Sequence, residues 1–147
     1  MMILDVNVLV YAYRQDSEEH VKYRQWLEIV LNGVEVFGVT HDVLSSVIRV
    51  VTHPRIFKKP SSFEEAHAFI RQVKDNDKCA LIMPGARHWD IFVSLCRQIK
   101  AEGNAIPDAY LAALVIETGN ELITTDKGFG RFPNLKWKHP LKDFSQN

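Results

Sequence analysis

MILDV, at residues 2–6, is a short apolar run that contains one carboxylate, Asp5. A run of this length and composition is typical of a buried β-strand. ELITT, at residues 121–125, has the same character and is directly followed by Asp126. The sequence therefore predicts two buried strands, each with an aspartate at its carboxyl end.

Between these two strands, segments with apolar residues at helical spacing alternate with short apolar runs. The predicted helices are one that begins with an N-cap at Asp16 and ends at Asn32-Gly33, and four more over residues 41–51, 62–75, 87–101 and 109–117. Gly103 and Gly119 are expected to end the last two of these helices. Further strands are predicted over 34–39 and 80–83, with an edge strand over 135–140.

This alternation of strands and helices predicts an α/β fold with a mainly parallel sheet. The chain contains no repeat, linker or low-complexity tract, so residues 1–147 are expected to form one domain. Ligands of such sheets bind beyond the carboxyl ends of the strands. Asp5 and Asp126 are therefore expected at the same edge of the sheet.

The composition excludes some classes of protein. No apolar run approaches the roughly 20 residues that a membrane span needs, and the N-terminus lacks the basic and small residues of a secretory signal, so a cytoplasmic protein without a membrane partner is expected. Lys plus Arg and Asp plus Glu both number 18, so the overall charge gives no indication of a nucleic-acid partner. Cys79 and Cys96 form no metal-binding or redox motif and are expected to be reduced thiols.

A third aspartate, Asp108, follows Pro107 at the start of a predicted helix, where the helix dipole favours a carboxylate. If Asp5, Asp108 and Asp126 converge, they need a cation between them, and oxygen ligands suit Mg²⁺ or Mn²⁺. Such an ion can activate water for hydrolysis of a phosphate ester. The spacing alone leaves another interpretation open, in which the three are ordinary caps and turn residues.

Five segments together resemble PIN-domain toxins of the VapC type, the toxin halves of bacterial toxin–antitoxin pairs. They are LDVNVLVYAYR (4–14), VIRVVTHPRIF (47–57), PGARHW (84–89), GNAIPDAYLAALVIE (103–117) and TTDKGFGRFPNLKW (124–137). The resemblance extends over nearly the whole chain, in the same order and with the same spacing. Its most specific parts are the DAxLAA and TTDxxFxRFP patterns.

The resemblance implies a PIN-like α/β/α sandwich around a central, mainly parallel sheet of about five strands. It also implies a Mg²⁺-dependent endoribonuclease (Mn²⁺ being the alternative metal) in which Asp5, Asp108 and Asp126 are catalytic and metal-coordinating. Asn7 would help to orient Asp5, and Thr125 would serve as a polar neighbour of Asp126. The implied partners are an RNA substrate, a cognate VapB-type antitoxin and a second copy of the chain in a homodimer.

The sequence departs from the family pattern at two positions. Many relatives carry a glutamate in the helix after the second strand, where this chain has Ser46, and an acidic residue near Gly128. A site with three carboxylates rather than four is expected to bind metal more weakly. Asp42 lies four residues before Ser46 on the same helical face, and it would act at most through a water molecule; otherwise it is an ordinary carboxylate near Arg49.

The missing glutamate favours an alternative, a catalytically weakened PIN-fold module that binds RNA or protein. A metal-free, histidine-based ribonuclease is a second alternative, but the six histidines form no paired motif. A receiver-like signalling domain and a phosphatase are further alternatives, but this sequence lacks the acidic motifs expected of either class. One face of the first long helix, formed by Tyr23, Trp26, Leu27 and Val30, is a candidate surface for a dimer or an antitoxin helix if the sheet cannot bury it.

Overall fold

The structure is a computed structural model and describes residues 1–142. Its elements are β1 (Met2–Leu4), α1 (Val6–Tyr13), α2 (His20–Asn32), β2 (Phe37–Val39), α3 (His41–Val51), α4 (Phe63–Lys74), β3 (Cys79–Leu81), α5 (His88–Ile99), α6 (Ala105–Thr118), β4 (Glu121–Ile123), the 3₁₀ helix η1 (Lys127–Arg131) and β5 (Trp137–Lys138). The last predicted strand, over 135–140, is confirmed as the two-residue β5.

Five strands form one sheet in the order β3-β2-β1-β4-β5, and every neighbouring pair is parallel. The first strand lies at the centre, where Met2 pairs with Phe37 of β2 on one side and with Glu121 of β4 on the other. Two segments that are far apart in the chain are thus adjacent in space. The predicted α/β fold with a mainly parallel sheet of about five strands is confirmed.

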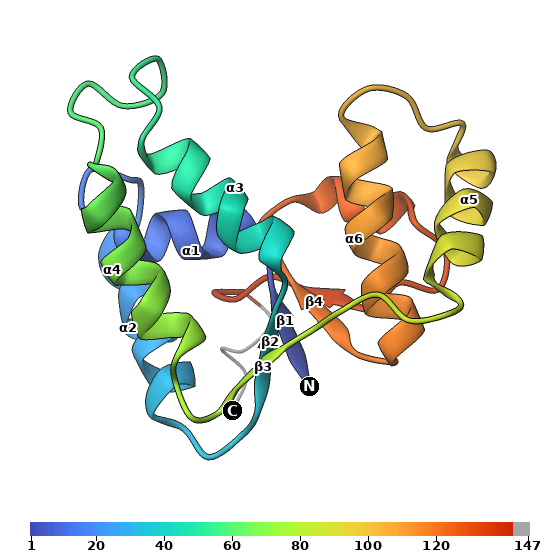
Figure 1. Cartoon of the computed structure of the whole chain (residues 1–147), viewed down its shortest axis with the longest axis horizontal. Helices are drawn as coiled ribbons and strands as arrows, with labels where there is room; N and C mark the ends of the chain where they lie inside the picture. The colour runs from blue at the N-terminus through green and yellow to red at the C-terminus, as the bar shows by residue number, and fades with distance from the viewer. Residues whose placement is uncertain (143–147) are drawn as a thin grey trace.

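Helices cover both faces of the sheet and give an α/β/α sandwich (Figure 1). Successive residues of a strand point to opposite faces. Accordingly, Leu4 and Ile123 pack into a core with α1 to α4, whereas Ile3 and Leu122 pack into a second core with α5, α6 and η1. Both cores are buried, so the central strands are apolar throughout.

The segment directly after Asp5 forms a helix, α1, that the sequence analysis did not predict. Its residues include Val6, Val8 and Val10, which are β-branched and favour strands. Burial decides the outcome, because Val8, Leu9 and Ala12 are inaccessible in the core. The predicted N-cap at Asp16 is wrong: α2 begins at His20 after Glu19, and the Asp16 carboxylate pairs with Arg14 instead.

The other helices agree with the predictions to within a few residues. The bounds of α3 are those expected, and α4 begins with a capping box in which Ser62 and Glu65 bond to each other's backbone N–H. Gly119 ends α6 in the left-handed conformation, as expected. The end of α5 differs, since Lys100 rather than Gly103 provides the left-handed residue directly after it.

The face of α2 formed by Tyr23, Trp26, Leu27 and Val30 is buried in the core, so the condition under which it would be a docking surface is not met. Val21 and Ile29 lie on the exposed side of this helix. None of the helices between residues 1 and 142 is both long enough and apolar enough to cross a membrane.

Candidate active site

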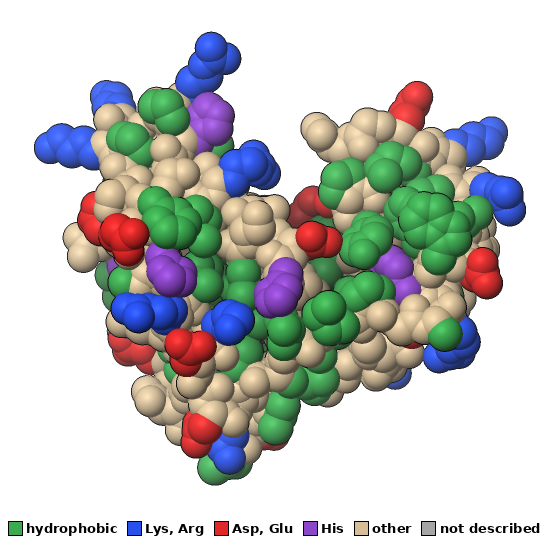
Figure 2. All heavy atoms as spheres, in the orientation of Figure 1, with side chains coloured by type: hydrophobic (Ala, Val, Ile, Leu, Met, Phe, Trp, Pro, Cys, Tyr) green, Lys and Arg blue, Asp and Glu red, His purple; other side chains and the backbone are tan. Residues whose placement is uncertain are grey.

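A hollow of about 510 Å³ opens at the carboxyl edge of the sheet, between α3 on one side and α6 on the other. Figure 2 shows acidic side chains within the depression between the two lobes of the molecule. Its polar lining comes from α1, α3, α6 and the β4–η1 connection, and comprises Asp5, Asn7, Thr40, Asp42, Ser45, Ser46, Arg49, Asp108, Tyr110 and Asp126. The three aspartates singled out in the sequence therefore share one cavity.

Asp5 is the most buried of these carboxylates, with 6% of its surface exposed. It is the N-cap of α1: its Oδ1 accepts a hydrogen bond of 2.7 Å from the backbone N–H of Val6. Burial raises the pKa of Asp5, and the negative charges of Asp108 and Asp126 raise it further, against the hydrogen bonds from Thr124 and Val6. The carboxylate of Asp5 is thus oriented by two donors, and the charged groups that raise its pKa, Asp108 and Asp126, are both acidic.

Thr124 is a residue of the site that the sequence analysis missed. Its side chain is fully buried, its Oγ1 donates a 2.7 Å hydrogen bond to Oδ2 of Asp5, and the same oxygen accepts a 3.0 Å bond from the backbone N–H of Asp126. One hydroxyl therefore links two of the three aspartates. Thr125, expected in a similar role, is half-buried.

Asp108 lies in the first turn of α6 and forms an ion pair with Arg131 of η1, with Nη2 3.0 Å from Oδ2. The pKa of Asp108 is raised because burial outweighs the favourable charge of Arg131, and Asp126 adds repulsion. The guanidinium also lies 5.1 Å from the ring centroid of Phe132, which is buried. Arg131 is therefore a resident positive charge at the rim of an acidic cavity.

Asp126 is exposed and begins η1, where its Oδ1 accepts a 2.8 Å hydrogen bond from the N–H of Gly128. A Cβ at position 128 would lie only 2.9 Å from that same oxygen. Any side chain here would push the Asp126 carboxylate aside. The glycine that departs from the family pattern thus allows the backbone to hold Asp126 directly.

Two of the remaining candidates, Asn7 and Ser46, are half-buried and line the hollow. Asp42 also lines it, from the first turn of α3, so a fourth carboxylate is present although Ser46 is neutral. Arg49, from the last turn of the same helix, adds a positive charge to the wall.

The donor chemistry of the hollow fits a hard divalent cation, because four carboxylates and several hydroxyl groups line it. Among residues 1–142, however, no three His, Cys, Asp or Glu side chains stand close enough together to hold a metal ion as they are. The Asp108–Arg131 pair gives a physical reason, since this carboxylate is turned toward a guanidinium.

Comparison with known proteins agrees with this fold. The family model described as "PIN domain" matches residues 2–135. The chain is 42% identical over 141 residues to Ribonuclease VapC43 of Mycobacterium tuberculosis, and the match covers 96% of each protein. It is 34% identical over 140 residues to Ribonuclease VapC25 of the same species, covering 95% of this chain and 99% of that protein.

Solved structures include a fold neighbour at low sequence identity. The structure of VapBC-1 from nontypeable Haemophilus influenzae superposes with a TM-score of 0.69 at 17% identity, covering 96% of this chain and 98% of that one. At this identity the likeness concerns the fold alone. With the family match and the VapC relatives, it makes the chain a member of the VapC group of the PIN-domain family.

Proposed function

We propose that this chain is a Mg²⁺-dependent endoribonuclease, the toxin component of a type II toxin–antitoxin pair. The observation that supports the proposal most is the grouping of Asp5, Asp108 and Asp126 in one hollow, with Asp5 buried and oriented at its base. Burying a carboxylate near two others is unfavourable unless a cation compensates the charge. The relatives named as ribonucleases support phosphodiester hydrolysis of RNA as the reaction.

Asp5, Asp108 and Asp126 are the residues that would hold Mg²⁺ or Mn²⁺. The ion would supply an activated water and neutralise charge on the phosphodiester. Asp5 needs little reorganisation for this task, because the N–H of Val6 and the hydroxyl of Thr124 already fix its two oxygens. Arg131 compensates the charge of Asp108 and, once released, is placed to bind a phosphate oxygen of RNA.

The proposal includes an antitoxin partner and a homodimer. It also includes a cytoplasmic location, because the RNA substrate is found there. VapBC-1 of H. influenzae and VapBC2 of Rickettsia felis are named as VapBC assemblies, and the latter was solved with a DNA fragment from their promoter. By analogy, a VapB-type protein would bind this chain and keep it from RNA.

The test is cleavage of a labelled single-stranded RNA by the purified chain, with Mg²⁺ and with EDTA. We expect cleavage only with Mg²⁺, and a loss of orders of magnitude in the Asp5→Asn and Asp126→Asn variants. Asp77→Asn is the matched control, because Asp77 is an exposed carboxylate outside the hollow. Far-UV circular dichroism would verify that all variants are folded.

Cleavage that persists in EDTA or in Asp5→Asn would contradict the proposed mechanism. RNA binding without cleavage under any metal condition would favour the second candidate, a binding module weakened in catalysis. The neutral Ser46 and the Asp108–Arg131 pair are the observations that favour this candidate.

A further inference from the structure

The loop between α3 and α4, residues 52–62, stands at the rim of the hollow. Helix α3 lines the hollow from Asp42 to Val50, and the α3–α4 loop follows directly at residue 52. In Figure 1 this loop projects beyond the end of α3. Figure 2 shows Lys and Arg side chains over the upper part of this lobe, most of them projecting outward into solvent, and Arg49 is the basic residue among those that line the hollow.

The α3–α4 loop carries the exposed basic residues Arg55, Lys58 and Lys59, and Arg49 precedes it on α3. Within residues 1–142, the ion pairs of the structure involve none of these four side chains. Arg14, by contrast, is largely buried and satisfied by a carboxylate. The four charges are therefore available to an external anion.

The conformation of the loop is held by hydrogen bonds. The carbonyl of His53 accepts from the N–H groups of Ile56 and Phe57, at 3.1 and 3.2 Å. At its far end, the N–H of Ser61 donates to the carbonyl of Val51 at 2.8 Å. A segment that is already ordered loses less conformational entropy when it binds a ligand.

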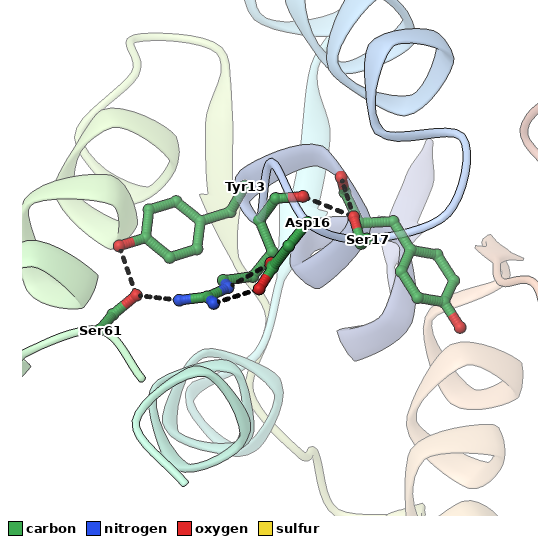
Figure 3. A network of polar contacts seen from close by, with 6 residues as sticks. Tyr13, Asp16, Ser17 and Ser61 are labelled. Atoms are coloured by element: carbon green, nitrogen blue, oxygen red, sulfur yellow. Dashed lines mark hydrogen bonds and ion pairs between the residues drawn. The ribbon is translucent and has the colours of Figure 1, made fainter. Parts of the chain in front are cut away.

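Arg14 fixes the loop to the body of the molecule. Its guanidinium donates two hydrogen bonds to the carboxylate of Asp16, at 2.8 and 2.6 Å, and one of 3.1 Å to Oγ of Ser61, which also accepts from Tyr13 at 3.0 Å (Figure 3). The same guanidinium lies 4.1 Å from the ring centroid of Phe57. One buried arginine thus connects the end of α1 with both the middle and the end of the loop.

We propose that the α3–α4 loop, seated by Arg14, is a clamp for the RNA backbone next to the cleavage site. This inference rests on the proposed function, since it names where the substrate of that site is held. Lys58, Lys59 and Arg55 bind phosphates flanking the scissile one, whereas the acidic hollow repels RNA unless cations compensate its charge. Arg14 does not touch the RNA and is a positioning residue.

The test measures RNA binding separately from cleavage. Affinity for a fluorescein-labelled oligoadenylate is followed by anisotropy in EDTA, over a range of NaCl concentrations. Each phosphate contact with single-stranded nucleic acid contributes about 0.7 to the slope of log K against log salt. The Lys58→Gln/Lys59→Gln variant is expected to flatten the slope by about 1.4, so that its affinity falls about sevenfold less than that of the wild type between about 50 and about 200 mM NaCl.

Two further variants make the result specific. Arg97→Gln/Lys100→Gln removes two exposed positive charges at the end of α5, outside the hollow and absent from the ion pairs among residues 1–142, and is expected to leave the slope unchanged. Arg14→Gln is expected to weaken RNA binding with all loop charges retained, and Asp16→Asn, which removes the carboxylate partner of Arg14, is expected to do the same if Arg14→Gln is poorly folded.

An unchanged slope in Lys58→Gln/Lys59→Gln would overturn the clamp. Equal weakening of binding to a glutamate-rich peptide would also overturn it, because the loop would then be a surface for acidic proteins. The two proposals can fail independently. If the protein shows no Mg²⁺-dependent cleavage but the salt slope still depends on the loop, the nuclease proposal fails and the clamp proposal stands. If the protein cleaves RNA but its RNA affinity does not change in the loop variant, the clamp proposal fails and the nuclease proposal stands.

Discussion

The hydroxyl of Thr124 joins two of the three aspartates of the site, because it donates to Asp5 and accepts from the backbone of Asp126. The sequence predicted both aspartates from their positions after apolar strands. It could not select Thr124 over Thr125, since the choice depends on the register in which Leu4 pairs with Ile123 and so places Asp5 beside the next residue. Nor could it pair Asp108 with Arg131, which lies 23 residues away on another element.

Replacing Thr124 by valine tests this shared hydroxyl. We expect the free energy of unfolding to fall by about 1–3 kcal/mol, because Asp5 and the N–H of Asp126 both lose a buried partner. The Kd for Mn²⁺ should rise about tenfold or more, as is usual when a residue that orients a metal ligand is lost. Urea unfolding and calorimetric Mn²⁺ titration measure the two effects.

Thr124→Ser retains the hydroxyl and is expected to recover most of the Mn²⁺ affinity. If valine lowers stability but leaves Mn²⁺ binding as it is, then Thr124 has only a structural role.

Replacing Arg131 by glutamine frees Asp108. Without RNA, we expect the Kd for Mn²⁺ to fall about two- to fivefold, because Arg131 no longer competes with the metal for Asp108. A partly exposed ion pair of this kind contributes up to about 1 kcal/mol. RNA affinity should decrease in the same variant, since a phosphate-binding group is lost. Calorimetry measures the first quantity and anisotropy the second.

Lys127→Gln is the control for Arg131→Gln, because it removes an exposed charge from the same 3₁₀ helix. Equal Mn²⁺ affinity gains in both variants would show that general electrostatics, and not the release of Asp108, accounts for the change.

At the scale of elements, the sequence predicted best where a capping pattern and an apolar stripe coincide. Helix α4 is such a case, with Ser62 and Glu65 at its start. Helix α1 was missed because its valines favour a strand. Its helical conformation depends on burial in the core, which residues far along the chain provide. The strands are shorter than predicted, since adjacent apolar residues such as Val34 and Val36 are exposed before β2 begins.

The capping box of α4 makes a prediction about pH. Hydrogen bonds from Ser62 lower the pKa of Glu65, so the charged carboxylate is favoured in the folded state. Its contribution to stability is therefore present above the pKa of the unfolded chain and is lost as the pH falls through the folded value. Glu65→Gln should destabilise the protein near neutral pH, and its difference from wild type should shrink as the pH falls below about 4.

Urea unfolding at a series of pH values measures this difference. Glu64→Gln is the neighbouring control, because Glu64 is exposed in the same first turn without the reciprocal bond to Ser62. A Glu65→Gln effect that is independent of pH would mean that the charge of Glu65 does not stabilise the cap.

At the scale of the whole molecule, the alternation of strands and helices was sufficient to predict the class of fold. It could not predict the strand order, which places β1 between β2 and β4 and so creates the shared edge. Large apolar side chains remain exposed around the edge strand β3 and the start of α5, among them Leu81, Met83 and Trp89. Figure 2 shows hydrophobic side chains spread over the face below the hollow.

The proposed homodimer is tested on this face. Trp89 is 63% exposed, and a tryptophan at the centre of an interface often contributes about 2 kcal/mol or more, so Trp89→Glu should raise the dimer Kd at least about thirtyfold. Sedimentation velocity over a concentration series measures the Kd. Ile29→Glu is the control, since Ile29 is 73% exposed on α2. A dimer that is insensitive to Trp89→Glu, or equally sensitive to both changes, must use another face.

The hydrogen bond between Thr124 and Asp5 joins residues 119 positions apart, and β1 pairs with a strand that begins only at Glu121. During synthesis Asp5 leaves the ribosome well before Thr124, Asp126 and β4 do. A nascent chain therefore cannot assemble the edge that holds Asp5 and Asp126 until β4 has emerged. For the proposed ribonuclease, this topology delays activity until β4 and the residues directly after it have been synthesised.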